Sequence, residues 1–454
     1  MSFCDECFGK QQKIDGLEEE IQRLRLRLNY QDRVKEKPFG SSTPSSKILH
    51  KSCSCEKNQK NQGGAKNGHK GHGRQSISKE EADEIIEIPA PDCCPECGEQ
   101  LSGHGETERT VKDIPNMEVK TVLYRIKRGY CNHCKKTITS KKVPVLPNSL
   151  VGNQLLAHTV EQHYIVGTPL NRLAEQSGIS LGTLIGSLHR LRELLKPVMS
   201  RLIEEYRSAS VKHADETGWR NNGNNGYAWL FSTPDTAIFR LRKTRGGQIA
   251  LEMFGNKRLP GVLVVDRYNG YNKAPCDIQY CQAHLLREIQ DLGKELPETK
   301  EVQEFVGTAA ELIAQTMRLR TAITEDKEYL EAAQGLRTKI ELIMGSEAQD
   351  PGIRRIQDIY RKHAGRMYHW SKGRNIPADN NFAERELRNL VISRKVSFGS
   401  QSDEGALTRE TLMSILHTMR LRGLPVRERF KAALDQLAES FQADKYSLLF
   451  SPDT

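Results

Sequence analysis

The sequence contains no long apolar run. No segment approaches the roughly 20 consecutive apolar residues that a membrane span requires, and the opening residues, MSFCDECFGK, lack a signal-peptide core. The hydrophobic fraction of 37% and mean hydropathy of −0.62 are low for a compact enzyme, which indicates solvated helices or tails. We therefore expect a cytoplasmic chain without a membrane partner. Its 454 residues exceed a single core and predict several domains.

Acidic residues are absent from two basic stretches. Lys57 to Arg74 contains five Lys or Arg, and Lys120 to Lys142 contains eight. Over the whole chain, 68 Lys plus Arg exceed 58 Asp plus Glu, giving a net charge of +10. This balance favours a polyanionic partner such as nucleic acid, and a nucleoid-associated location.

The 11 cysteines are an odd number, which argues against a fully paired disulfide framework. Eight fall in close pairs: Cys4 and Cys7, Cys53 and Cys55, Cys94 and Cys97, Cys131 and Cys134. The CPEC and CNHC motifs predict one structural Zn²⁺ held by Cys94, Cys97, Cys131 and Cys134. Free buried thiols are the alternative, and Cys93 beside Cys94 is a competing ligand. We assign no role to the other two pairs.

The pattern predicts a multidomain α+β chain. Residues 1–35 are predicted to form a coiled-coil dimerisation helix, with Ile14, Leu17, Ile21, Leu24 and Leu28 as its seam. A surface helix that docks on its own domain would show the same pattern. Residues 36–79 are a predicted basic flexible linker, residues 80–147 a zinc-binding module, and residues 401–454 a C-terminal helical tail.

Residues 150–207 are predicted to be a helical DNA-binding region of the helix-turn-helix type. Ala174 precedes Gly178 by four residues and Ile179 follows, so a small residue stands where two helices cross and a glycine turns the chain. An ordinary helical hairpin needs the same turn chemistry and stays an open alternative.

Residues 208–400 are predicted to form the catalytic domain. Three short runs rich in β-branched and aromatic residues come first, then a short helix (GQIALEMFGN), then two strands, GVLVVDRYNGY and IQYCQAHLL. That order is typical of a ribonuclease-H-like fold. A charged helical insertion is predicted at about residues 296–370, and a last helix starts near Asn380.

Three acids stand where such a fold would bring them together. Asp215 follows a strand entry, Asp266 ends the most apolar strand, and Glu384 would face them from the last helix. Glu386 points about 200° away from Glu384 on a helix, while Asp379 suits a helix cap. Phosphodiester chemistry requires such carboxylates to hold two divalent ions about 3.5–4 Å apart. We therefore predict a catalytic site of Asp215, Asp266 and Glu384 that binds two Mg²⁺, or Mn²⁺ as a substitute.

Basic side chains near Glu384 are candidates for DNA contacts: Arg385, Arg388, Arg394 and Lys395, with His284 from the segment before the insertion. Solvated surface charge is the competing interpretation of each cation. A hydrogen-bonded structural residue is the competing interpretation of His284. Glu216 is predicted to point to the opposite side of the strand from Asp215 and is left out of the triad.

The chain resembles the insertion sequence 66 (IS66-type) group within the DDE transposases. The matching segments are HADETGW around Asp215, VVDRYNGY around Asp266, CQAHLLRE at 281–288, DNNFAERELRNLVISRK at 379–395, GGAKNGHKGHGR, the two CxxC pairs and TPLNRLAEQSGISLGTL. The sequence departs from the family at Gln282, where the family often has Trp, and in its additional Cys53 and Cys55.

The resemblance implies that the three acids are a metal-binding triad that cleaves DNA strands and transfers the element's ends. It also implies double-stranded DNA as partner, a homo-oligomer, and accessory proteins of the same element. Two other functions stay open: a regulatory DNA-binding protein without activity, and a metal-dependent nuclease of the same fold.

Overall fold

The computed structural model describes residues 13–14, 16–18, 20–21, 24–25, 28, 85, 118–139 and 143–451. Cys4, Cys7, Cys53, Cys55, Cys93, Cys94, Cys97 and the predicted basic linker lie outside them. The described residues before position 29 are helical, and the predicted seam residues among them are 48–61% exposed. Their pairing with a second copy stays a prediction. By contacts the chain divides into two units, His50–Leu123 and the remainder.

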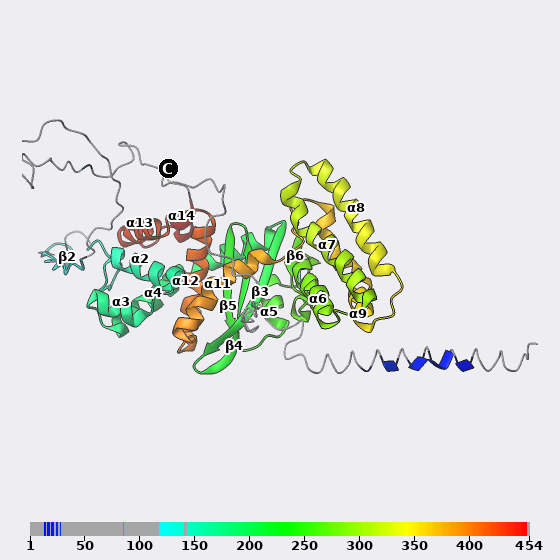
Figure 1. Ribbon diagram of the computed structural model, residues 1–454. Helices are drawn as coiled ribbons and strands as arrows, with labels where there is room; N and C mark the ends of the chain where they lie inside the picture. The colour runs from blue at the N-terminus through cyan, green and yellow to red at the C-terminus, as the bar shows by residue number, and fades with distance from the viewer. Residues whose placement is uncertain are drawn as a thin grey trace, which may run out of the picture. The chain divides into compact units, whose positions relative to one another are not determined.

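Figure 1 shows the strands and helices of the described chain. The strands are β1 (Arg128–Cys131), β2 (Lys136–Thr139), β3 (Val211–Asn221), β4 (Asn224–Thr233), β5 (Thr236–Arg242), β6 (Val262–Val265) and β7 (Asp277–Tyr280). The helices up to β7 are α2 (Asn153–Glu161), the π-helix η3 (Gln162–Val166), α3 (Leu170–Ser177), α4 (Leu181–Ser208), α5 (Gln248–Phe254) and the 3-10 helix η4 (Asn269–Lys273). The later ones are α6 (Gln282–Glu295), α7 (Lys300–Ala322), α8 (Asp326–Gly345), α9 (Pro351–Lys362), α10 (Ala364–Met367), the 3-10 helix η5 (His369–Lys372), α11 (Asn381–Ser397), α12 (Asp403–Leu421), α13 (Val426–Glu439) and α14 (Lys445–Phe450).

A five-stranded mixed sheet is the centre of the fold. Its order is β5-β4-β3-β6-β7, with β3, β4 and β5 antiparallel and with β6 and β7 parallel to β3. The predicted α+β class and the predicted succession of strands are confirmed. Two predicted strands end earlier than expected: GVLVVDRYNGY ends as a strand at Val265, before η4, and IQYCQAHLL ends at Tyr280, before α6 begins at Gln282. Leu285, Ile289 and Leu292 are all buried, and their helical spacing decides the conformation there.

Aromatic packing fixes which helices cover the sheet. Trp229 and Phe231 of β4 are fully buried. Tyr206 of α4 lies 5.9 Å from the Phe231 ring, Phe254 of α5 lies 5.8 Å from it, and Tyr271 of η4 lies 5.6 Å from the Trp229 ring. All three elements therefore share one face of the sheet, and the segment that follows Asp266 is held on Trp229.

The open edge of β5 is covered by side chains of α12. The backbone N–H groups of alternate strand residues point away from β4, toward this helix. Ala237 donates to Thr418 Oγ1 (3.0 Å), Phe239 to Ser414 Oγ (2.9 Å) and Leu241 to Glu410 Oε1 (2.7 Å). The acceptors are four residues apart on α12, which is a rise of about 6 Å, and the donors are two residues apart on β5, which is a rise of about 6.8 Å. The two spacings therefore match. We call these three acceptors the edge ladder.

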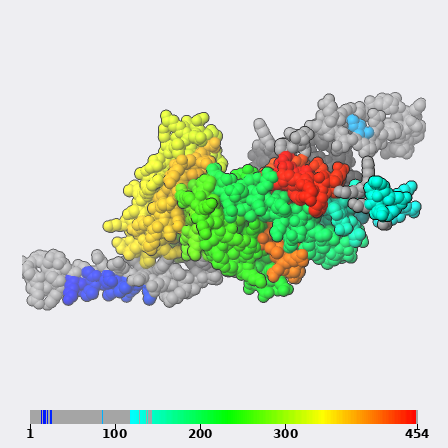
Figure 2. Space-filling view, turned by 180° about the vertical axis from the view of Figure 1, so that it is seen from behind, coloured from blue at the N-terminus to red at the C-terminus, as the bar shows by residue number. Residues whose placement is uncertain are grey.

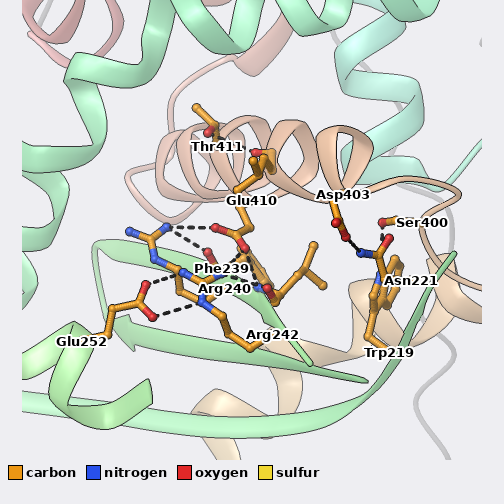
Figure 3. A network of polar contacts seen from close by, with 12 residues as sticks. Trp219, Asn221, Phe239, Arg240, Arg242, Glu252, Ser400, Asp403, Glu410 and Thr411 are labelled. Atoms are coloured by element: carbon orange, nitrogen blue, oxygen red, sulfur yellow. Dashed lines mark hydrogen bonds and ion pairs between the residues drawn. The ribbon is translucent and has the colours of Figure 1, made fainter. Parts of the chain in front are cut away.

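Glu410 also ends a chain of charged contacts (Figure 3). Its carboxylate lies 2.5 Å from Arg242 Nη1 and 3.6 Å from Arg240 Nη1. Burial raises the pKa of Glu410, and the two guanidinium groups lower it. Glu252, whose side chain is about half exposed, pairs with the outer side of Arg242.

The predicted helix pair before the sheet is present as α3 and α4. Gly178 ends α3 in the left-handed region (φ +67°), and the Ser180 hydroxyl caps α4 by accepting the Thr183 N–H at 3.2 Å. Ala174 packs with Leu184 where the helices cross. DNA binding by this pair stays a prediction.

The predicted insertion consists of helices α7 to α10, which Figure 2 shows in yellow as one lobe beside the green strands. Its two ends meet, because the Gln282 N–H donates to the Ala378 carbonyl at 2.8 Å. Among the residues described, none belongs to a helix long and apolar enough to cross a membrane.

We expect Glu410→Ala to lower the free energy of unfolding by about 3 kcal/mol, because it leaves Arg240 without its carboxylate partner and the Leu241 N–H without an acceptor. The matched control is Glu252→Ala, which removes a half-exposed partner of Arg242 and should lower it by less than about 1 kcal/mol. Urea unfolding followed by tryptophan fluorescence measures both changes. Equal losses would contradict the role given to the edge ladder.

Candidate active site

Asp215 and Asp266 come from neighbouring parallel strands. The pairing of β3 with β6 sets Val211 opposite Val262 and His213 opposite Val264. The pairing ends there, and the same register continued by two residues would set Asp215 opposite Asp266, which directly follows β6, on one face of the sheet. Asp266 is near enough to raise the pKa of Asp215. The sheet itself therefore brings the first two predicted acids together.

These two carboxylates lie in an environment that disfavours their charge. Burial raises the pKa of Asp266 to about 7, and the Glu216 carboxylate contributes to the same shift. Burial raises the pKa of Asp215 well above its ordinary value, and Glu216, Asp266 and Glu384 add to that rise. Backbone N–H groups of Glu216 and Tyr268 donate to Asp215 and Asp266, each at 2.9 Å, and offset only part of the effect. A bound cation would favour the charged form of both carboxylates and so lower these pKa values.

Glu384 lies in the first turn of α11, the helix predicted from the sequence. Its carboxylate is 3.3 Å from Arg287 Nη2 and is close enough to Asp215 to raise the pKa of that group. Burial raises the pKa of Glu384 itself, against the effect of Arg287. Glu386 lies on another side of the helix and pairs with Arg420 of α12. Of the two glutamates, Glu384 is thus the one that lies near Asp215.

Asn380 anchors the start of α11 to the sheet. Its side-chain amide donates to the Ala214 carbonyl at 2.8 Å, and its Oδ1 lies 2.9 Å from His213 Nδ1. Burial lowers the pKa of His213 to about 4, so a neutral imidazole donates this second bond. The Asn380 N–H donates to Cys281 Sγ at 3.2 Å. Asn380 therefore ties the helix that carries Glu384 to the residue next to Asp215.

Glu216 is buried on the aromatic face of the sheet. It stands opposite Trp229, accepts a hydrogen bond from the Tyr271 hydroxyl, and pairs with Arg245, whose Nε lies 2.8 Å from its Oε1. The guanidinium group of Arg245 stacks on the Tyr268 ring at 3.9 Å. The two adjacent acids in HADETGW signal this arrangement, because each acid of a buried strand needs its own partner.

Arg287 and His284 approach Glu384 from α6. They are three residues apart, so they share one face of that helix. Burial lowers the pKa of His284 to about 3, and its Nε2 lies 3.9 Å from Glu384 Oε1, too far for a hydrogen bond. The sequence analysis does not identify Arg287, because the predicted strand IQYCQAHLL ends one residue before it and hides the helical spacing that sets Arg287 on the same face as His284.

The basic residues predicted on α11 fall into two groups. Arg394 turns toward β3, where it donates to Thr217 Oγ1 at 3.0 Å and to the Gly218 carbonyl. Arg385, Arg388 and Lys395 are exposed.

Cys131 and Cys134 stand at the turn between β1 and β2. The Cys134 N–H donates to Cys131 Sγ at 3.4 Å, and this bond lowers the pKa of Cys131. Lys135 completes the turn in the left-handed region (φ +49°). The two thiols of CNHC are therefore on one tight turn. The other predicted ligands, Cys94 and Cys97, lie outside the described residues.

The acidic side chains of the described residues do not form a closed metal site. Within residues 118–139, 143–451 and the few described before them, no three His, Cys, Asp or Glu side chains are set closely enough to hold an ion. The donor chemistry of the two aspartates and Glu384 nevertheless suits a hard divalent cation, which takes oxygen ligands. Glu384 is engaged with Arg287 instead.

Three curated relatives come from Sinorhizobium fredii (strain NBRC 101917 / NGR234), and each is named as an uncharacterized protein. The chain is 25% identical to y4jD over 75% of its own length and 74% of the relative's length. It is 23% identical to y4hP, over 81% and 74% of the two lengths, and 22% identical to y4qI, over 82% and 76%.

A family match covers the site. Residues 148–408, more than half of the chain, match the family described as "Transposase IS66 family". The matched segment contains Asp215, Asp266 and Glu384 as well as the helix pair α3–α4. The chain therefore belongs to the IS66 family of transposases.

Proposed function

We propose that the chain is a DNA transposase that binds the ends of its own element and cleaves and joins DNA strands by metal-dependent phosphodiester chemistry. The observation that supports this proposal is the parallel register of β3 with β6, which runs to within two residues of Asp215 and Asp266, together with the effect of Asp266 on the pKa of Asp215. Glu384 approaches them from α11, and burial disfavours the charge of all three acids. Such a cluster is expensive to maintain in a fold unless a cation binds to it.

The sheet supports the ribonuclease-H-like assignment. Its order, with the first three strands antiparallel and the last two parallel to the first, follows the succession that the sequence predicted for that fold. One acid on the central strand, one at the end of its parallel neighbour, and one on a later helix suit phosphodiester chemistry. The catalytic function rests on these positions and on the family, not on the fold alone.

Asp215, Asp266 and Glu384 would hold the divalent ions, with Mg²⁺ or Mn²⁺ as the expected metal. When bound, the ions would activate the attacking oxygen and stabilise the departing one. To bind an ion, Glu384 must release Arg287, because its carboxylate pairs with that guanidinium group in the structure. Arg287 would then be free to contact a DNA phosphate.

The other residues of the site position these groups. Asn380 binds the Ala214 carbonyl at the start of α11 and so holds the backbone that carries Glu384 against the sheet. Arg245 and Tyr271 hold Glu216 on the aromatic face. The uncharged His284 beside Glu384 adds no positive charge to compete with an ion.

The zinc site is part of the proposal. The Cys131–Cys134 turn presents two thiols with an N–H to sulfur hydrogen bond that favours the thiolate, which is the form that binds Zn²⁺. Cys94 and Cys97 would complete a tetrahedral structural site. The exposed Arg385, Arg388 and Lys395 would add phosphate contacts near the catalytic acids.

We expect wild-type protein with Mg²⁺ to nick and join a labelled duplex that carries the end of its element. Asp266→Asn should slow both steps by about 10²–10³-fold or more while it still binds the duplex. Asp277→Asn, a change at an exposed aspartate of β7, is the matched control and should act as wild type. Cleavage without joining would favour a nuclease, and specific binding without cleavage by wild type would favour a regulatory protein.

The acidic site should also set the pH dependence of stability. Because the pKa of Asp266 is raised to about 7, its favourable contribution is complete below about pH 4 and is lost as the pH rises through 7. In metal-free buffer at pH 8, Asp266→Asn should therefore be more stable than wild type, by about 1–2 kcal/mol. The difference in unfolding free energy between Asp266→Asn and wild type should be smaller at pH 5. Mg²⁺ should raise the melting temperature of wild type and not that of Asp266→Asn.

Scanning calorimetry in EDTA measures this effect. Asp277→Asn is again the control. Because Arg258 lowers the pKa of Asp277, this substitution should make the protein less stable at pH 8, the opposite of the effect expected for Asp266→Asn. A wild-type protein that is more stable than Asp266→Asn at pH 8 without metal would refute the charge argument.

Purified protein should contain one zinc per chain, and Cys131→Ser should lose it because a tetrahedral site does not survive the loss of one thiolate. Elemental analysis after dialysis gives the zinc content. Cys276→Ala removes a buried thiol elsewhere and should keep the metal. Unchanged zinc in Cys131→Ser would exclude that cysteine as a ligand.

A further inference from the structure

The outer face of α11 combines basic and apolar side chains. Arg385, Arg388 and Lys395 are exposed there, and Ile392 between them is 51% exposed. These positions recur every three or four residues and so lie along one side of the helix. In the part of the chain that the structure describes, no carboxylate lies within ion-pair distance of the three cations. Such a face suits a polyanion.

Phe398 stands at the end of this face. It is 73% exposed and adopts the left-handed conformation (φ +60°), which is unfavourable for a bulky residue. Gly399 follows at φ +133°, where a Cβ atom would meet the Arg220 carbonyl at 2.2 Å. The Ser400 N–H donates to that carbonyl at 2.9 Å. The chain after Phe398 is therefore held in place, and the ring is displayed on a fixed backbone.

The turn of the β3–β4 hairpin is hydrogen-bonded to Ser400, two residues after Phe398. The Asn222 N–H donates to the Ser400 carbonyl at 2.9 Å, and Trp219 Nε1 donates to Ser400 Oγ at 3.1 Å (Figure 3). Asn222 and Gly223 both have positive φ, as the tight hairpin turn that matches the twist of the strands requires. Residues 222–225 are exposed, and three of them are asparagines. The turn thus displays amide groups, which can hydrogen-bond to base edges or phosphates.

An acidic side chain borders this surface at the start of α12. The Asn221 side chain, on the strand just before the turn, binds Asp403 at the start of α12 (Figure 3). Lys243 lies 4.0 Å from the same carboxylate. The acid is thus engaged with two partners at the α12 side.

We propose that this surface, formed by Arg385, Arg388, Lys395, Phe398 and the turn 222–225, binds duplex DNA beside the cleavage point, with the Phe398 ring stacked against a base. The inference rests on the proposed transposase function and adds the place where the helix meets the DNA. An exposed, rigid aromatic ring suits base stacking, and the cations before it suit phosphates.

The helix length predicts where the ring reaches. Glu384 and Phe398 are fourteen residues apart, or about 21 Å along a helix. At about 3.4 Å per base pair this corresponds to roughly six base pairs. Phe398 should therefore contact the duplex about six base pairs from the phosphate that the catalytic acids attack, and Arg385 and Arg388 should contact phosphates nearer the cleavage point.

The test uses full-length protein and a duplex carrying the element's end, with 2-aminopurine placed singly at each of the ten positions beside the cleavage point. EDTA prevents cleavage. We expect a change in 2-aminopurine fluorescence near the sixth base pair with wild type and with Asp266→Asn. Phe398→Gly should remove the change and weaken binding by about tenfold, the order expected for one lost stacking contact. Phe398→Trp should retain both.

Phe398→Gly suits this test because glycine favours the left-handed conformation, so the variant should fold at least as well as wild type. Leu342→Ala, at a 77% exposed residue of α8, is the matched control and should bind as wild type. Unchanged fluorescence and affinity in Phe398→Gly would overturn the proposal. So would a change in sedimentation without DNA, since the ring would then cover a second copy.

The two proposals can fail separately. If wild type cleaves and joins the duplex while Phe398→Gly is indistinguishable from it, only the stacking contact is refuted. If wild type does not bind the duplex at all, the proposed function is refuted together with the contact.

Discussion

Repulsion between two neighbouring carboxylates is the constraint on which this structure depends. The parallel register of β3 and β6 leaves Asp215 and Asp266 side by side in a largely buried place. Water would screen such a pair, but a protein interior screens it poorly. The surroundings do little to relieve it, because Arg245 is paired with Glu216 and Arg287 with Glu384. A fold that keeps this charge unbalanced is prepared for a cation.

The remainder of the site can be understood as support for that pair. The third acid reaches it from a helix separated from β7 by the whole helical insertion. Two contacts close the gap: the Gln282 N–H bonds the Ala378 carbonyl, and Asn380 bonds Ala214 and His213. The insertion therefore starts and ends at one place, and its own helices can vary without moving Glu384 relative to the sheet.

Much of this arrangement follows from local sequence. The β-branched and aromatic runs before residue 243, the apolar run of β6 and the helical segment that starts near Asn380 each predict their element. Asp215 lies in β3, Asp266 directly after β6 and Glu384 in α11. Glu384 could be chosen over Glu386 from helix geometry alone. The end of the strand at Tyr280 could not be predicted, because a short apolar run is compatible with a strand or a helix. The choice depends on which side chains the fold buries, and those are Leu285, Ile289 and Leu292.

Partners from distant segments were beyond sequence reasoning. Nothing in the residues around Asn380 indicates that its amide will meet Ala214, since 166 positions separate them. The same is true of Arg287 with Glu384 and of the charged contacts around Glu410. A segment predicted to be a helical tail supplies α12, which hydrogen-bonds to the sheet. Its pattern of Glu410, Ser414 and Thr418 is visible in the sequence, but its meaning depends on the strand that it covers.

The edge ladder has a consequence for the order in which the protein can be completed during synthesis. The ribosome makes β5 more than 160 residues before α12, so the edge of that strand waits uncovered while the insertion is translated. Uncovered strand edges are templates for pairing with other chains. The edge of the five-stranded sheet is therefore covered only when the helix at 403–421 has emerged, and a nascent chain released before that point would carry an unfinished and association-prone sheet.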